Sequence, residues 1–194
     1  MANLYDSVNH IYRSKSGRLP GATDVIRVEG LVNPDWLTEF ARWRGQCVHR
    51  GIELLNRDEL DWSTVDVEII GYLRSYERFL SVSKFEVVGA EQDCFSTAFA
   101  CLPDLWGYLN AQTTIVELKT GPVPDWAAFQ TALQRRALAE DRDFLAVKRF
   151  GLQLMGDGSL AKLQPFDDYH DERRAMGMVE MFHWKKDHGY FKWE

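Results

Sequence analysis

The stretch "TTIVELKTG", residues 113–121, has the composition of a β-strand but carries two charges inside it. Its first four residues are all β-branched, and Gly121 with Pro122 ends the segment. Side chains alternate across a strand, so Glu117 and Lys119 point to the same face. A solvated ion pair explains this pattern, and so does a working site. Other segments of the chain are needed to distinguish a solvated ion pair from a functional site.

The preceding stretch "LPDLWGYLN", residues 102–110, predicts the strand that pairs with it. A turn centred between residues 110 and 111 would place Asp104 opposite Glu117, provided that no bulge shifts the register. Two carboxylates ~5 Å apart repel each other by about 3 kcal/mol at an effective dielectric constant of about 20. A hard divalent cation, Mg²⁺ or Mn²⁺, would turn this repulsion into a binding site. Lys119 beside it would orient a water molecule and stabilise an anionic transition state.

The composition bounds the class of protein. A chain of 194 residues with 45% apolar content has the length and hydrophobicity of one globular domain, which we expect to span residues 1–194. The net charge of −6 is unfavourable for coating nucleic acid through bulk electrostatics, but it allows an enzyme whose carboxylates surround a metal. No apolar run is long enough to span a bilayer, and the polar opening residues lack a signal segment, so we expect a cytoplasmic protein without a membrane partner.

The three cysteines, Cys47, Cys94 and Cys101, do not form a metal-binding pattern. Their number is odd, no CxxC pair occurs, and an all-cysteine zinc site or iron–sulfur cluster needs four. We therefore expect buried, reduced thiols and no iron–sulfur cluster. A disulfide between Cys94 and Cys101 is the alternative, which a reducing compartment disfavours.

Hydrophobic periodicity divides the chain into segments of predicted structure. Residues 1–30 read as a hairpin or an extended segment. A helix should begin at Asn33, which can cap it, with Pro34 in the first turn, and Gly45 should either break this helix or allow close packing. A second helix is expected over residues 64–82.

The second half of the chain is richer in strands. The expected elements are strands over residues 84–121 with turns at Gly89 and at 110–112, a helix over 124–141, a hairpin over 144–166 that turns at 156–158, and a helix over 167–188. This order predicts an α/β fold in which a central mixed sheet is flanked by helices, with helices near the N-terminus and a C-terminal hairpin plus helix.

Together, "PDLWGYLN" and "TTIVELKTG" resemble the signature of the PD-(D/E)XK nuclease superfamily, and in particular its RecB-like and phage recombination exonuclease branch. Three further stretches fit in chain order. "RWRGQCVHRGIELL" resembles the upstream helical motif that contains His49, "VVGAEQDCFS" resembles the strand that carries Glu91, and "WAAFQTALQRRAL" resembles the helix that carries Gln130. A departure is Gln134, which stands where many relatives have tyrosine.

This resemblance implies a restriction-endonuclease-like fold and a set of site residues. His49, Asp104, Glu117 and the Leu118 carbonyl would bind one or two Mg²⁺ or Mn²⁺ ions. Lys119 would position the attacking water. Glu91 would bind a second metal or hold a water, and Gln130 would reach the site or the DNA backbone.

Basic residues near these motifs could contact phosphates, although each is also typical of a solvated helix face. The candidates are Arg42, Arg44 and Arg50 near His49, and Arg135 and Arg136 after Gln130. Trp126, at the start of a helix near the expected site, could stack on a base.

The resemblance implies a metal-dependent nuclease, more specifically a phage-type exonuclease that hydrolyses linear DNA in recombination or repair in a bacterial host cell. DNA would be its substrate, and a single-strand annealing protein or further copies of the chain could be partners. Two alternatives stay open. One is a catalytically inactive DNA-binding or structural module, and the other is a site-specific endonuclease.

Overall fold

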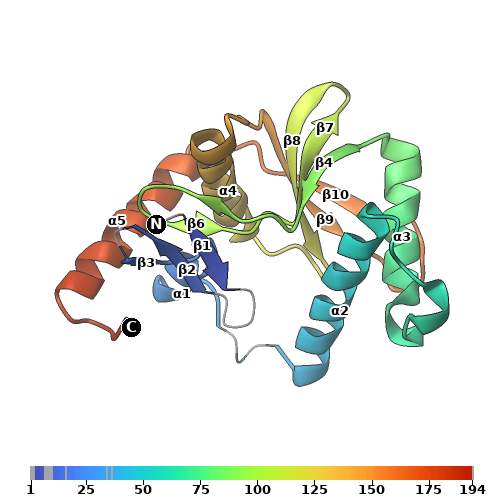
Figure 1. Cartoon of the computed structure of the whole chain (residues 1–194), viewed down its shortest axis with the longest axis horizontal. Helices are drawn as coiled ribbons and strands as arrows, with labels where there is room; N and C mark the ends of the chain where they lie inside the picture. Colours follow the sequence, from blue (N-terminus) through green and yellow to red (C-terminus); the bar gives the residue numbers. More distant parts are fainter. Residues whose placement is uncertain (1–2, 7–10, 16, 34, 36, 194) are drawn as a thin grey trace.

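A five-stranded mixed sheet forms the centre of the molecule (Figure 1). The computed structural model describes residues 3–6, 11–15, 17–33, 35 and 37–193. The strand order is β10-β9-β8-β7-β4, in which β8 and β9 are parallel and every other neighbouring pair is antiparallel. The strands are β4 (Glu86–Ala90), β7 (Leu105–Leu109), β8 (Gln112–Lys119), β9 (Lys148–Gln153) and β10 (Lys162–Pro165). The predicted α/β class with a central mixed sheet is confirmed.

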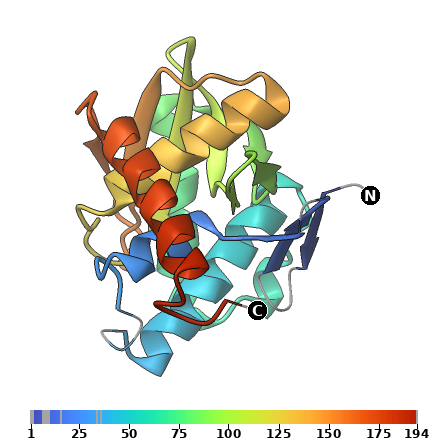
Figure 2. The ribbon, with the colours of Figure 1, turned by 90° about the vertical axis from the view of Figure 1, so that its left-hand side faces the viewer.

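Helices cover both faces of this sheet (Figures 1 and 2). Helices α2 (Glu39–Asn56) and α3 (Val67–Ser83) pack on one face. Helix α4 (Ala127–Arg142) packs on the other face, with α1 (Ala22–Val28) and α5 (Asp171–Asp187) against it. No helix among the described residues is long and apolar enough to cross a bilayer.

Smaller elements extend the α4 side. They are a three-stranded sheet of β1 (Leu4–Asp6), β2 (Ile11–Ser14) and β3 (Gly17–Leu19), and a two-stranded sheet of β5 (Cys94–Phe95) and β6 (Ala100–Cys101). A 3₁₀ turn, η2 (Trp62–Thr64), links α2 to α3 on the opposite face, where Trp62 packs against the core of those helices. Residues 22–28 form helix α1, so the prediction of a wholly hairpin-like or extended segment up to residue 30 was wrong there.

The alternation of side chains along β8 divides the hydrophobic core in two. Ile115 belongs to the cluster that contains α4 and α5, whereas Val116 and Leu118 belong to the cluster that contains α2 and α3. Because direction alternates with residue number, Glu117 and Lys119 share the α4 side with Ile115. The strand thus delivers both charged residues to the face covered by α4.

The predicted register of the β7–β8 hairpin is confirmed. Leu105 pairs with Val116 and Leu109 pairs with Gln112, which leaves a two-residue loop. The loop residues Asn110 and Ala111 have φ angles of 51° and 60°, and positive φ at both positions is the geometry of a type I′ turn. This turn fixes which residues of the two strands face each other down to Asp104, the residue that precedes β7.

The predicted start of helix α2 and the predicted role of Gly45 were both wrong. Helix α2 begins at Glu39 with Thr38 as its cap, while Asn33 accepts a hydrogen bond from the Asp35 amide in a separate turn. Pro34 lies outside the described residues. The helix runs through Gly45 without a break, and a side chain at Gly45 would meet open space.

Gly89 does not form the predicted turn. It lies within β4, at a bulge that follows Val87, and the Trp106 ring occupies the place where a Cβ atom would be, with Nε1 2.2 Å away from it. The glycine is needed for this close approach rather than for a change of chain direction.

The cysteines agree with part of the prediction. Cys94 and Cys101 are buried cross-strand partners, and they are free thiols with their Sγ atoms 3.3 Å apart. Cys47 is half-buried rather than buried.

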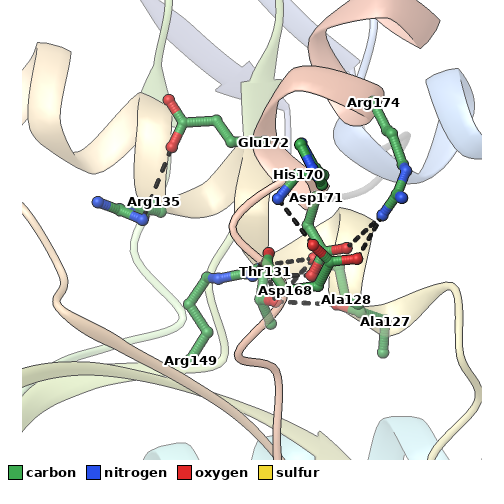
Figure 3. Close-up of polar contacts among 10 residues, drawn as sticks. All are labelled: Ala127, Ala128, Thr131, Arg135, Arg149, Asp168, His170, Asp171, Glu172 and Arg174. Atoms are coloured by element: carbon green, nitrogen blue, oxygen red, sulfur yellow. Dashed lines mark hydrogen bonds and ion pairs between the residues drawn. The ribbon is translucent and has the colours of Figure 1, made fainter.

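A buried ion pair ties α5 to the sheet (Figure 3). Arg149 on β9 is 6% exposed, and its Nη2 lies 2.8 Å from the Asp171 carboxylate at the start of α5. Its Nη1 donates to the Ala128 carbonyl of α4 at 2.6 Å. Arg174 and Asp168 add a second pair, at 2.6 Å, that is about half exposed. Arg149 therefore joins three elements in the interior.

The two glycines Gly71 and Gly45 provide a matched test of the packing. A Cβ on Gly71 would lie 1.7 Å from the Gly156 carbonyl oxygen, so Gly71→Ala should destabilise the protein by about 3 kcal/mol. Gly45→Ala should instead stabilise it by about 0.5–1 kcal/mol, because alanine restricts the unfolded chain at an open helix position. Urea denaturation measures both changes, and equal effects of the two substitutions would contradict this account.

A second test concerns the ion pairs of α5. Asp171→Asn leaves the Arg149 guanidinium buried without its counter-charge and should cost about 3 kcal/mol of unfolding free energy. Asp168→Asn alters the exposed pair, whose attraction is screened by water, and should cost measurably less. The same denaturation experiment compares them, and a smaller loss for Asp171→Asn than for Asp168→Asn would show that the buried pair does not anchor α5.

Candidate metal centre

Three potential metal ligands from distant parts of the chain meet at the end of the β7–β8 hairpin. His49 comes from α2, Glu91 follows β4, and Asp104 precedes β7. One ligand atom from each lies within 4.8 Å of the others. Asp104 is buried, and the other two are half-buried. This group, called the metal triad below, could hold a metal ion.

The metal triad is held together by direct contacts. His49 Nδ1 lies 2.8 Å from Glu91 Oε1 and 3.4 Å from Asp104 Oδ1. The other oxygen of Asp104, Oδ2, accepts a hydrogen bond of 2.6 Å from the Leu118 amide. Asp104 is therefore fixed on both sides, by the imidazole and by the backbone of β8.

The surrounding carboxylates favour the protonated form of the His49 imidazole. Burial lowers the pKa of His49, but the charge and hydrogen bond of Asp104 and those of Glu91 outweigh it and raise this pKa well above its usual value. Protonated His49 thus places one positive charge between two carboxylates. A divalent cation bound there would replace this charge.

A second charged group lies beside the metal triad. Lys119 Nζ contacts Glu117 Oε1 at 2.6 Å, and Gln134 on α4 donates from Nε2 to Glu117 Oε2 at 2.7 Å. Burial, and then the charge of Asp104, raise the pKa of Glu117. Burial lowers the pKa of Lys119, but Glu117 and Asp104 outweigh it and raise that pKa above its usual value. Lys119 is accordingly an ammonium cation.

The backbone at Glu91 is in an uncommon conformation. Its φ angle is 48°, in the left-handed region that a residue with a side chain seldom adopts. Its amide donates to the Asp104 carbonyl at 3.1 Å, which holds the segment after β4 against the segment before β7. This conformation costs about 1–3 kcal/mol in a residue other than glycine, and the surrounding contacts maintain it here.

The donor set fits a divalent metal. Two carboxylates and one imidazole suit Mn²⁺, and Mg²⁺ with more water in its coordination shell. Two carboxylates, with a third at Glu117 nearby, provide negative charge that a bound cation would offset. Leu118 contacts Asp104 through its amide.

The predicted DNA-contacting residues divide into those near the site and one that points elsewhere. Gln130 lies one helical turn before Gln134 on α4, and Arg44 and Arg50 lie on α2 near His49. Arg50 is paired with Glu53. Arg135 instead reaches Glu172 on α5, at 3.8 Å (Figure 3).

Two grooves approach the metal triad. One, of about 580 Å³, is lined by Tyr5, Arg50, His49 and Glu91 among others, and we call it the Tyr5 groove. The second, of about 520 Å³, is the Trp126 groove; its lining residues include Arg42, Arg44, His49, Lys119 and Trp126. His49 borders both, so the two grooves meet at the metal triad.

Gln134 is a site residue that the sequence did not identify. The sequence marked it only as a departure from tyrosine, whereas the structure places its amide on the Glu117 carboxylate at the end of a side chain that is 1% exposed. The signal available was its spacing of four from Gln130, which puts both glutamines on the same face of a helix.

No protein-family model matches the chain, and no curated protein matches it. The geometry of the site is therefore the basis for the proposed function.

Titration with Mn²⁺ tests the metal centre directly. We expect saturable binding by isothermal calorimetry and a rise of the melting temperature with Mn²⁺ concentration, since a ligand that binds the folded state stabilises it. Asp104→Asn should weaken this binding by about tenfold or more, because one anionic ligand is lost. The amide oxygen can still accept from Leu118, so this variant should remain folded without metal, which its melting curve checks.

Asp187→Asn is the control, because this carboxylate is 65% exposed and lies at the far end of α5. It should bind Mn²⁺ as the wild type does. Equal binding by both variants would show that the metal triad is not the site.

Proposed function

We propose that this chain is a metal-dependent deoxyribonuclease with a PD-(D/E)XK active site on a restriction-endonuclease-like fold. The observation that carries the proposal is the convergence of His49, Glu91 and Asp104 beside the Glu117–Lys119 pair. The resemblance includes all of these residues, and His49 on α2 and Glu91 after β4 come from segments separate from the β7–β8 hairpin that carries Asp104 and the E-x-K residues. An exposed ion pair on an ordinary hairpin would not gather these residues.

The side chains provide most of what hydrolysis of a phosphodiester requires. A bound Mg²⁺ or Mn²⁺ would supply positive charge next to the phosphate. Lys119 presents an ammonium that can orient a water molecule and stabilise negative charge on phosphate oxygens as the water oxygen bonds to phosphorus and the ester bond breaks. Glu117 fixes that ammonium at 2.6 Å, and Gln134 fixes Glu117 in turn. Both contacts are made before substrate binds.

The Trp126 groove supports a nucleic-acid substrate. It is lined by the cations Arg42, Arg44 and Lys119, and by the indole of Trp126, over which Lys119 Nζ lies at 5.1 Å from the ring centroid. Cations contact phosphates and an aromatic ring stacks on a base, and neither contact depends on sequence. We therefore expect binding that weakens with salt and shows little sequence preference.

The finer assignment is a phage-type exonuclease that acts on linear DNA. A catalytically inactive DNA-binding module is the alternative. Such a module would not require an ammonium group beside a metal triad. A site-specific endonuclease would need contacts to base edges.

A cleavage assay tests the proposal. Purified protein with Mg²⁺ or Mn²⁺ should degrade linear DNA, and chelation of the metal should stop the reaction. Lys119→Met should lower the rate by about 10²–10³-fold, the usual effect of removing one group that stabilises developing charge. Lys185→Met is its control, because this lysine pairs with Glu29 on the α5 side of the molecule.

The form of the DNA separates the alternatives. Loss of linear DNA while closed circular DNA stays intact would support the exonuclease assignment, whereas cuts in circular DNA would support an endonuclease. The proposal would be overturned if the wild type binds DNA but cleaves neither linear nor circular DNA any faster than Lys119→Met does. That result would support the binding module.

A further inference from the structure

A third cavity, of about 460 Å³, lies between α1, the N-terminal sheet and α4. Its lining includes Tyr5 and Tyr12, Arg18, Arg27, Gln130 and Gln134. Its size falls within the range of ~300–1,000 Å³ that is usual for small-molecule sites. None of the steps proposed above uses this space, which we call the glutamine cavity.

Two glutamines of the cavity have hydrogen-bonding capacity to spare. Among the residues that the structure describes, nothing donates to Oε1 of Gln130 or to Oε1 of Gln134, although both oxygens are buried. The Gln134 side chain is 1% exposed, and its Nε2 is already committed to Glu117. A buried acceptor without a donor costs about 1–3 kcal/mol, so such an atom in a cavity wall indicates a missing partner.

A ligand can reach these oxygens with small movements. The terminal torsion of glutamine has a broad energy profile, so the Gln130 amide can turn toward the cavity without leaving a preferred rotamer, while Gln134 keeps its nitrogen on Glu117 and offers its oxygen where it stands. The partner has to be a hydrogen-bond donor, because a carbonyl oxygen only accepts. A phosphate, whose oxygens would repel both amide oxygens, does not fit this part of the wall.

The rest of the lining suits a nucleotide. The Tyr5 and Tyr12 rings are stacked, with centroids 4.7 Å apart and planes at 19°, and form an aromatic wall. Arg27 is paired with Asp24 at 3.1 Å. Arg18 lies over the Trp193 ring and, in the described part of the chain, has no ion pair and no partner for its Nε. The cavity thus offers acceptors, aromatic surface and one uncompensated cation.

The glutamine cavity adjoins the metal triad. Tyr5 lines both this cavity and the Tyr5 groove, which also contains His49 and Glu91. Gln134 lines the cavity and contacts Glu117. A nucleotide held here is therefore next to the phosphate that would be cleaved.

We propose that the glutamine cavity binds the terminal nucleotide of a single strand, with an exocyclic amine of its base donating to the side-chain oxygens of Gln130 and Gln134. This inference rests on the proposed function, which it deepens. The base lies on the α4 side of the cavity, and its phosphate charge is balanced by Arg18. Adenine, cytosine and guanine carry such an amine, and thymine does not.

Short single-stranded oligonucleotides that contain 2-aminopurine test this without cleavage. The fluorescent base, which bears an exocyclic amine, is placed at the 5′ end, at the 3′ end or at the centre of the strand. The protein is titrated into each labelled strand in the presence of a chelator. One of the two end-labelled strands should respond more strongly than the strand labelled at its centre. An unlabelled strand that ends in adenine should compete about tenfold better than one that ends in thymine, the effect of about one hydrogen bond.

Gln130→Leu separates a ligand-binding role from a structural one. It should weaken binding of the end-labelled strand by about tenfold. Its melting temperature should equal or exceed that of the wild type, because a buried acceptor without a donor is removed. The control is Gln164→Leu on the exposed strand β10, which should bind as the wild type does.

The outcomes distinguish this inference from the proposed function. Equal responses of end and centre labels, wild-type affinity of Gln130→Leu, or a lower melting temperature of Gln130→Leu would each overturn the nucleotide cavity. Absence of DNA cleavage together with the expected fluorescence pattern would overturn the nuclease and leave the cavity. Cleavage without that pattern would leave the nuclease and overturn the cavity.

Discussion

Repulsion between carboxylates at the end of one hairpin is the constraint on which the site depends. The β7–β8 register brings Asp104 to the same end of the hairpin as Glu117, and burial, followed by the charge of Asp104, raises the pKa of Glu117. Both side chains are almost fully buried, so water screens this repulsion poorly. The fold can keep them there only by supplying donors and positive charge from other elements.

Each layer of the molecule supplies a part of that compensation. Helix α2 brings His49, whose Nδ1 lies within 3.4 Å of both Glu91 and Asp104. Helix α4 brings Gln134 to Glu117, and β8 itself contributes Lys119 and the Leu118 amide. Because the donors come from both faces of the sheet, the site can form only at the strand ends, where the two layers meet. The packing of α2 and α4 on the sheet is therefore also what assembles the site.

The sequence predicts what is encoded locally. The β7–β8 hairpin, its turn at Asn110 and Ala111, and the common face of Glu117 and Lys119 follow from short-range rules of twist and alternation. The start of α2 was misplaced because Asn33 has the chemistry of a cap but forms an isolated turn. Contacts between distant elements, such as that of the Trp106 ring with Gly89, could not be predicted from the sequence. His49 and Glu91 were assigned from a resemblance, since nothing in their own segments specifies that they meet.

The two glutamines of α4 show how a helix face can be shared between stability and binding. Gln134 uses its amide nitrogen to hold Glu117, which leaves its oxygen on the other side of the same planar group without a donor. Gln130, one turn earlier, has an oxygen in the same condition. A leucine at Gln130 would fill similar volume without an unpaired acceptor, so packing alone favours leucine there, whereas a leucine at Gln134 would remove the donor to Glu117. Two unpaired acceptors on one helical face, beside a cavity and next to a charged site, are the positions at which the proposed nucleotide would donate.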